Sequence, residues 1–350
     1  MVNFDIFSVP KEFYEKMLED IKNARSYIYL ETFIYWDDVI GKAFKKALTQ
    51  KAKEGVKIKL LLDSWSAKIP KDYFSELEGY GGAVRYFREI KYVLRTVSKN
   101  HERNHRKLLL IDGELSYIGS ANISAEFYPN GRELVMRLNG DITRVFARTF
   151  LKNWSEVGNL TPKRIKRIIH RGFEIIQDIP SEIYKATENK YIKLIQSSRK
   201  EILIESPYFV PSRGIRKAFA RAIRRGVKVK VLIPFKSDMY IADVVRNRYL
   251  GIAYRDGVDL YYYPRKTHAK LLIIDSKFFL LGSTNLDYRS FLHQYEINLI
   301  GRDPKMIKAL KDFFNQGLRE ASLFNYKEWK RRSSLKKFPE LFLYLIRRYV

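Results

Sequence analysis

The stretch GKAFKKALTQKAKEGVKIKLLLD, from Gly41 to Asp63, joins a helical pattern to a strand pattern. Its apolar residues first recur at helical spacing, a glycine follows, and the final KIKLLLD ends in an apolar run. Helix-spaced apolar residues that stop at a glycine before such a run predict an α-helix leading into a buried strand. This order of elements favours an α/β fold.

The same pattern returns in GIRKAFARAIRRGVKVKVLIP, from Gly214 to Pro234. Three more pairs of strand-like segments keep the same order in both halves: FDIFSVP with FEIIQDIP, RSYIYLETFIY with RKEILIESPYFVP, and GGAVRYF with DGVDLYYY. An internal repeat of this length predicts two copies of one domain. We therefore expect two similar α/β/α sandwich domains, residues 1–157 and 158–350, related by pseudo-twofold symmetry with the active site at their interface.

The composition restricts the chemistry and the partners. The 350 residues are 46% hydrophobic and carry a net charge of +27, which implies an anionic partner such as nucleic acid, an anionic membrane surface or a phosphate-bearing substrate. The absence of cysteine excludes disulfides, thiolate metal sites and cysteine nucleophiles. The N-terminus lacks a signal-peptide pattern and no apolar run is long enough to span a bilayer, so we expect a soluble or peripheral cytoplasmic protein.

A set of polar residues also occurs twice in the sequence. The stretch NHRKLLLIDGELSYIGSAN, Asn104–Asn122, is a predicted hairpin with polar ends, and THAKLLIIDSKFFLLGSTN, Thr267–Asn285, repeats it with identical spacing. Polar groups at the ends of buried strands cost free energy unless they are bonded or used. The matching pairs are His105 and His268, Lys107 and Lys270, Asp112 and Asp275, Ser120 and Ser283, Asn122 and Asn285, and Glu133 and Glu296.

These residue types together can bind and transfer a phosphoryl group. Lysine, serine and asparagine are donors that would hold an anionic phosphate without a metal or another cofactor. One neutral imidazole can attack phosphorus while a second, protonated imidazole protonates the leaving oxygen. Glu133 and Glu296 are the candidates to fix the two histidine tautomers. We interpret Asp112 and Asp275, which lie at predicted turns, as structural.

Both copies fit the pattern H-x-K-x4-D-x6-G-S-x-N, which resembles the signature of the phospholipase D superfamily. In detail the chain resembles bacterial cardiolipin synthases over nearly its whole length, in segments such as GRELVMRLNG, SPYFVP and GSTNLDYRSFLHQYEINL. The resemblance implies a phosphatidyltransferase that takes a phosphatidyl group from phosphatidylglycerol through a covalent phosphohistidine. It implies His105 as the nucleophile and His268 as the acid and base. With water as the acceptor, the same chemistry would be that of a phospholipase D.

Two other functions remain open at this stage. Relatives with the same signature cleave DNA, and the positive charge suits a metal-independent nuclease as well, although we find no known nucleic-acid reader module. A non-catalytic protein that binds anionic lipid is also possible, but it leaves both polar sets unexplained. Because both sets lie on one chain, no oligomer is required for a complete site.

The C-terminal stretch KEWKRRSSLKKFPELFLYLIRRYV is basic and places Phe338, Leu341, Phe342 and Leu345 at helical spacing. This pattern is typical of a helix that lies on an anionic membrane surface, here the inner face of the cell membrane. The alternative is a helix that packs on the second domain and leaves only its basic residues in water. A further basic segment, KYVLRTVSKNHER before His105, is expected to form a lip over the site.

Overall fold

The computed structural model describes residues 2–87, 102–157, 167–345 and 347–348. The chain divides into two compact units, Met1–Ile165 and Lys166–Val350. The sequence predicts that the second domain starts at residue 158, and the second of these units starts at Lys166. The predicted lip before His105 lies largely outside the described residues.

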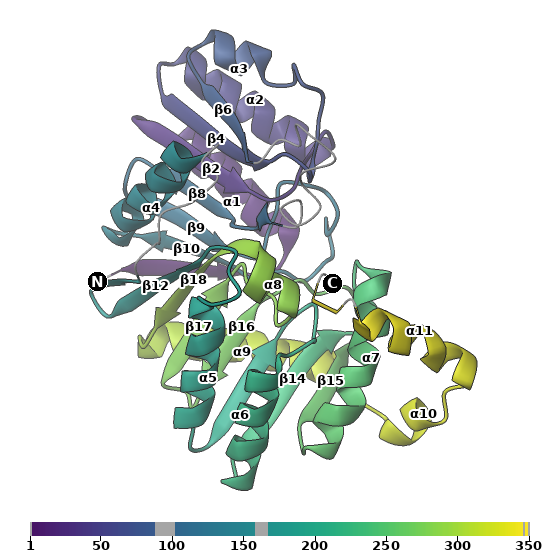
Figure 1. Ribbon diagram of the computed structural model, residues 1–350. Helices are drawn as coiled ribbons and strands as arrows, with labels where there is room; N and C mark the ends of the chain where they lie inside the picture. The colour runs from purple at the N-terminus through teal and green to yellow at the C-terminus, as the bar shows by residue number, and fades with distance from the viewer. Residues whose placement is uncertain (1, 88–101, 158–166, 346, 349–350) are drawn as a thin grey trace. The chain divides into compact units, whose positions relative to one another are not determined.

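The sheet of the first unit has the strand order β1-β10-β9-β8-β2-β4-β6 (Figure 1). Strands β2, β4 and β6 run parallel, and the neighbours β2-β8, β8-β9, β9-β10 and β10-β1 pair antiparallel. A short pair, β3 with β5, lies apart from this sheet. The strands of the first unit are β1 (Asn3–Phe7), β2 (Tyr27–Thr32), β3 (Tyr35–Trp36), β4 (Lys57–Asp63), β5 (Ala67–Lys68), β6 (Ala83–Phe87), β7 (Arg103–Asn104), β8 (Leu108–Ile111), β9 (Leu115–Gly119) and β10 (Val135–Asn139).

Helices cover both faces of this sheet. Phe13 of α1, Phe44 of α2 and Leu77 of α3 are fully buried in one core cluster on one face. On the other face α4 packs against β2, β8, β9 and β10, and the ring of its Phe150 stacks on Tyr29 with centroids 5.0 Å apart. The predicted α/β/α sandwich is confirmed. The helices are α1 (Pro10–Lys22), α2 (Val39–Lys53), α3 (Ser75–Gly79) and α4 (Ile142–Glu156).

The sheet of the second unit has the order β11-β12-β18-β17-β16-β13-β14-β15-β19. Without its edge strands β11 and β19, this order repeats that of the first unit strand for strand, so the predicted internal repeat is confirmed. The strands are β11 (Ile168–His170), β12 (Phe173–Asp178), β13 (Glu201–Glu205), β14 (Lys228–Pro234), β15 (Asp259–Tyr263), β16 (Leu271–Ile274), β17 (Phe278–Gly282), β18 (Gln294–Gly301) and β19 (Ser322–Leu323).

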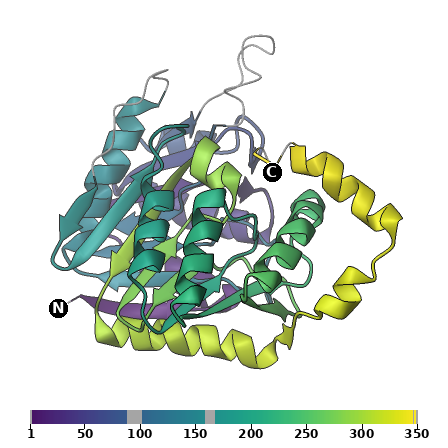
Figure 2. The same cartoon turned by 60° about the horizontal axis from the view of Figure 1, so that its bottom comes forward.

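The helices of the second unit also lie on both sides of the sheet. Helices α5, α6 and α7 contribute to one buried core, and α9 packs against β15, β16 and β17 as a long helix visible in Figure 2. The helices are α5 (Ala186–Ser197), α6 (Arg213–Arg224), α7 (Tyr240–Arg255), α8 (Tyr288–His293), α9 (Pro304–Glu320), α10 (Tyr326–Lys330) and α11 (Ser334–Leu345).

The C-terminal helix α11 is amphipathic and has one packed face and one exposed apolar face. It lies beside α7, where Leu343 and Tyr344 pack against the core of the second unit (Figure 2). Phe338, Leu341 and Phe342 point away and are 74%, 59% and 65% exposed. The packing that the second interpretation expects is therefore observed for one face of the helix, and contact of the exposed face with a membrane stays a prediction.

A carboxylate at each hairpin turn ties the turn to a neighbouring strand. Asp112, between β8 and β9, has φ of 54°, and its carboxylate accepts hydrogen bonds of 2.7–2.9 Å from the backbone N–H groups of Arg25, Ser26 and Tyr27. A short polar side chain tolerates this left-handed conformation better than most residues do. The start of β2 is thereby fixed to the end of β8.

The second unit repeats this anchor. Asp275 has φ of 53°, and its carboxylate accepts hydrogen bonds of 2.7–3.0 Å from the backbone N–H groups of Arg199, Lys200 and Glu201. The start of β13 is fixed to the end of β16 in the same way. In both units the signature aspartate therefore holds the far end of the hairpin whose near end carries the histidine.

We predict that Asp275→Ala lowers the free energy of unfolding by about 3 kcal/mol, because three backbone N–H groups lose a charged acceptor. Urea denaturation measures the change. The control is Asp259→Ala, which removes an exposed aspartate of β15. Equal stability of the two variants would contradict the anchoring role.

Candidate functional site

The predicted polar residues of each unit gather at one edge of its sheet. His105 and Lys107 directly precede β8, Ser120 directly follows β9, and Glu133 lies just before β10. Because these three strands are antiparallel neighbours, those ends meet at the same edge. All four side chains are buried, with at most 4% exposed.

The second unit has the same arrangement. His268 and Lys270 directly precede β16, Ser283 follows β17, and Glu296 lies near the start of β18. These strands also pair antiparallel, and the four side chains are again at most 4% exposed. Buried polar groups in native proteins are hydrogen-bonded, so the partners of each group indicate its role.

Each lysine binds the backbone of its own histidine. Lys107 Nζ donates to the carbonyl oxygen of His105 at 2.7 Å. Lys270 Nζ donates to the carbonyl oxygen of His268 at the same distance. An ammonium group has three protons, and this bond uses one of them. The lysines thus steady the histidine backbone, and their binding of phosphate stays a prediction.

Each serine is bonded to the glutamate that the sequence paired with the histidine. Ser120 Oγ donates to Glu133 and accepts the backbone N–H of Leu134 at 2.8 Å. A hydroxyl has one proton, and here it belongs to the bond with the carboxylate. The hydroxyl of Ser120 therefore orients Glu133 in this conformation, and its predicted role as a phosphate donor stays a prediction.

The second serine has matching bonds. Ser283 Oγ donates to Glu296 and accepts the backbone N–H of Ile297 at 2.9 Å. The two units therefore share a serine–carboxylate pair held by a backbone N–H group. That Glu133 and Glu296 fix the tautomers of the two histidines stays a prediction.

The asparagines are held in different ways. Asn122 Oδ1 accepts the backbone N–H of Ile34 at 3.2 Å, which leaves its amide nitrogen as the remaining donor. Asn285 is 3% exposed, and its Oδ1 has no hydrogen-bond partner in the described part of the chain. Binding of phosphate by these side chains would use their amide N–H groups, and this predicted role stays a prediction.

Two buried tyrosines stand near the glutamates, and sequence reasoning missed them. Burial raises the pKa of Tyr14, and the negative charge of Glu133 raises it further. Burial and the charge of Glu296 raise the pKa of Tyr191 in the same way. Tyr14 comes from α1 and Tyr191 from α5, and both keep their protons at neutral pH. Their signal in the sequence is weak, because a tyrosine on an apolar helix face looks like any core residue.

Two further residues distinguish the halves. The ring of Phe33, which follows β2, meets the imidazole of His105 edge to face with centroids 4.9 Å apart. Asp287 is 3% exposed and accepts the backbone N–H of Ser290 at 2.7 Å, and Ser124 stands at the matching place in the first half. Burial raises the pKa of Asp287 to about 6. Both residues lie beside the motifs, where a search for repeated residues cannot detect them.

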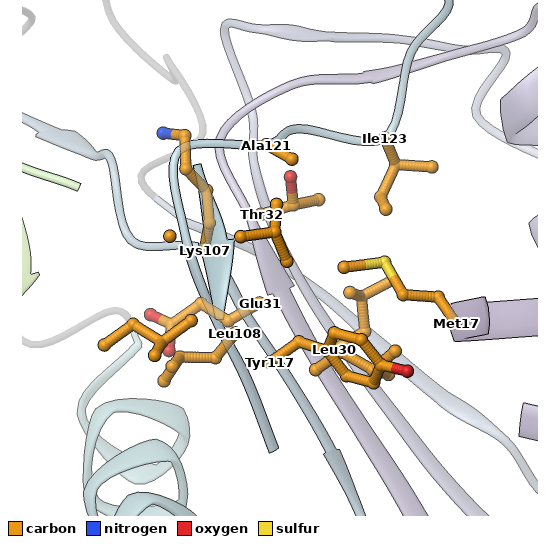
Figure 3. Close-up of a pocket in the computed structure, with 13 residues that line it drawn as sticks. Met17, Leu30, Glu31, Thr32, Lys107, Leu108, Tyr117, Ala121 and Ile123 are labelled. Carbon is orange, nitrogen blue, oxygen red and sulfur yellow. The ribbon is translucent and has the colours of Figure 1, made fainter. Parts of the chain in front are cut away.

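A small void lies behind the site of the first unit. Its volume is about 20 Å³, and its lining includes Lys107, Thr32, Met17 and Ile123 (Figure 3). That volume is close to the space of one water molecule and is too small for a phosphate. The void is therefore a packing detail and not a substrate pocket.

Comparison with known proteins identifies the family. The family model described as "Cardiolipin synthase, PLD-like domain" matches residues 17–154 and 191–318, which is one match in each unit. The chain belongs to this family. The predicted resemblance to the phospholipase D superfamily and to cardiolipin synthases is confirmed.

Relatives match along nearly the whole chain. The major cardiolipin synthase of Bacillus subtilis is 30% identical over 345 residues, covering 94% of this chain and 71% of that protein. Cardiolipin synthase 1 of Staphylococcus epidermidis is 31% identical over 352 residues, covering 96% of this chain and 72% of that protein.

A solved structure shares the fold. The phosphatidylserine synthase of Haemophilus influenzae superposes with a TM-score of 0.74 at 14% identity, covering 99% of this chain and 92% of that one. At this level of identity the likeness shows that the two chains share a fold. Within the described ranges, none of the helices is long and apolar enough to cross a bilayer.

The raised pKa of Asp287 predicts a pH dependence of stability. Its folded-state pKa of about 6 lies above the usual 3.8, so the folded protein holds this proton more tightly than the unfolded chain does. The favourable contribution is present at about pH 4 and is lost as the pH rises through about 6.

We predict that Asp287→Asn, which keeps an acceptor for Ser290, removes this dependence. The difference in unfolding free energy, variant minus wild type, should increase by about 2 kcal/mol between about pH 4 and pH 7. Denaturant titrations at several pH values measure it. A difference that does not change with pH would contradict the raised pKa.

Proposed function

We propose that the protein is a phosphatidyltransferase of cardiolipin synthase type that uses its two polar sets in one reaction. The observation that supports the proposal is that both units of this family member contain the same set of hydrogen bonds. In each unit, a lysine holds the histidine backbone, a serine holds a glutamate, and an aspartate anchors the hairpin. Cardiolipin synthase relatives matching almost the full chain support the activity.

The proposed first step forms a covalent intermediate. A ring nitrogen of neutral His105 attacks the phosphorus of phosphatidylglycerol, so a P–N bond forms as the P–O bond to the glycerol headgroup breaks. Protonated His268 gives its proton to the departing glycerol oxygen. Lys107 and Lys270 supply positive charge for the phosphate oxygens, with Asn122 and Asn285 as further polar contacts.

The second step transfers the phosphatidyl group. His268, now neutral, accepts the proton of an incoming hydroxyl, whose oxygen attacks phosphorus as the P–N bond to His105 breaks. With a second phosphatidylglycerol as the acceptor, the product is cardiolipin and the enzyme returns to its starting protonation state. With water as the acceptor, the product is phosphatidic acid. The groups that act in this scheme all belong to the chain itself.

We predict that His268→Asn traps the phosphohistidine, because the first step is slowed less than the second when a good leaving group replaces glycerol. Incubation with a phosphatidyl p-nitrophenyl ester should release one equivalent of p-nitrophenol and leave a labelled protein. His105→Asn is the matched control and should give neither burst nor label. Labelling of His105→Asn but not of His268→Asn would reverse the two roles.

The nuclease remains the alternative because the chain carries a net charge of +27. Nucleic acid and anionic lipid both suit this charge. The two functions are separated by incubating the protein with phosphatidylglycerol vesicles or with single-stranded DNA. Metal-independent DNA cleavage without a lipid product would favour the nuclease, while DNA binding that disappears with salt would show only that the protein is basic.

We also propose that α11 attaches the protein to an anionic membrane surface, on the inner face of the cell membrane. Phe338, Leu341 and Phe342 form an exposed apolar face, which we name the α11 apolar face. Lys337 and Arg348, both exposed, lie beside it, and Arg348 is also paired with Glu182. Exposed apolar side chains with basic neighbours match the interface of a bilayer that contains anionic lipid.

We predict that replacing all three residues of the α11 apolar face with serine weakens binding to phosphatidylglycerol vesicles by about tenfold or more. Cosedimentation with the vesicles measures binding. Activity on a short-chain, monomeric phosphatidylglycerol should persist, because the helix lies outside the polar sets. Ile169→Ser, which changes another exposed apolar residue of the second unit, is the control. Unchanged vesicle binding by the triple variant would contradict this attachment.

A further inference from the structure

In both units a buried glutamate on the adjacent strand binds the residue that directly precedes the histidine. Asn104 Nδ2 donates to Glu31 Oε1 at 2.8 Å. Thr267 Oγ1 donates to Glu205 Oε1 at 2.7 Å. Glu31 lies near the end of β2 and Glu205 at the end of β13, and both are at most 1% exposed. The donor differs between the halves, but the contact is the same.

Burying these two carboxylates costs free energy of desolvation. Burial raises the pKa of Glu31, while the charge of Arg106 and hydrogen bonds from Asn104 and Asn153 lower it. Figure 3 shows the Glu31 side chain directed away from Met17 and towards the side of the sheet that α4 covers. An apolar residue would pack there at a lower cost in desolvation. A bonded carboxylate in both halves therefore indicates a task beyond packing.

The position of the contact shows what that task is. Neighbouring side chains of an extended segment point to opposite sides, so a bond to Asn104 or Thr267 fixes the backbone from the side opposite the imidazole. The lysine already binds the histidine carbonyl oxygen at 2.7 Å in both units. Together the two contacts hold the backbone before and after the histidine Cα atom, and so they set where its ring stands.

We propose that Glu31 and Glu205 are positioning residues, which place His105 and His268 for phosphoryl transfer through Asn104 and Thr267. The inference rests on the proposed function for the reaction that is affected. Catalysis depends on placing the attacking and proton-donating atoms, and a shift of about 1 Å can cost about a hundredfold in rate. Loss of either contact should lower kcat and leave KM nearly unchanged, because both glutamates are buried and at most 1% exposed.

The two halves differ in how firmly this segment is held. In the first unit Asp63 adds a second anchor: its Oδ2 accepts the backbone N–H of Asn104 at 3.0 Å, and its Oδ1 lies 3.7 Å from Nη1 of buried Arg103. The matching strand of the second unit ends in Pro234, which has no carboxylate. Removal of the side-chain contact should therefore have a larger effect at Thr267 than at Asn104.

The test compares Thr267→Val with Thr267→Ser in the full chain. Valine keeps the shape and removes the donor, whereas serine keeps the donor. With phosphatidylglycerol as substrate, we expect Thr267→Val to lower kcat by about 30-fold or more with KM within about twofold, and Thr267→Ser to recover most of kcat. Asn104→Val should lower kcat less than Thr267→Val does. Asn104→Thr, which installs the donor of the second unit, should recover most of kcat.

Two further measurements distinguish the loss of a positioning contact from a loss of stability and from a different overall reaction. Thermal unfolding reports stability, and the ¹H–¹⁵N imidazole signals of His268 report its surroundings without any substrate. We expect Thr267→Val to move the His268 signals and Thr267→Ser to leave them near the wild-type values. Unmoved signals, or serine no better than valine, would overturn the positioning role. Absence of cardiolipin formation by the wild-type protein would overturn the proposed function instead, while the imidazole signals would still decide the positioning.

Discussion

Each half of this protein depends on the three hydrogen bonds that the turn aspartate accepts from a neighbouring strand. Asp112 and Asp275 fix the far ends of the two hairpins to the first residues of β2 and β13. A buried apolar strand of four residues joins this anchor to the segment that carries the histidine. With one end anchored and the middle buried, the polar end has little freedom, which is the condition that a preorganised site requires.

Several polar groups at these strand ends are hydrogen-bonded within their own half. Lysine binds the histidine carbonyl and serine binds glutamate, so these buried groups are paired. The surroundings of the two histidines differ nonetheless. Phe33 meets the ring of His105, while buried Asp287 stands close to the polar set of the second half. A shared frame with unequal surroundings suits two histidines that take different roles in the proposed reaction.

The sequence predicted the repeat, the sandwich and the hairpins because these follow from apolar periodicity and turn residues. The order of strands in both sheets agrees with that prediction. Individual hydrogen bonds did not follow from the pattern. Ser120 lies in a motif that suggests phosphate binding, yet its one proton goes to Glu133, and this depends on distances that only the folded chain fixes. Tyr14 was missed because it resembles a core aromatic residue. Glu31 was missed because the repeated strand that carries it was interpreted through its apolar residues. The amphipathic spacing in α11 was visible, but which face would be covered depended on packing against α7.

We propose that two sets of polar residues on one chain together carry out a transfer between lipids. The most direct measurement is the product balance with phosphatidylglycerol vesicles, followed by mass spectrometry in the presence of a chelator. The account predicts cardiolipin and free glycerol in equal amounts, formed at the expense of two phosphatidylglycerol molecules each time. Formation of phosphatidic acid alone, or consumption of no lipid at all, would contradict it.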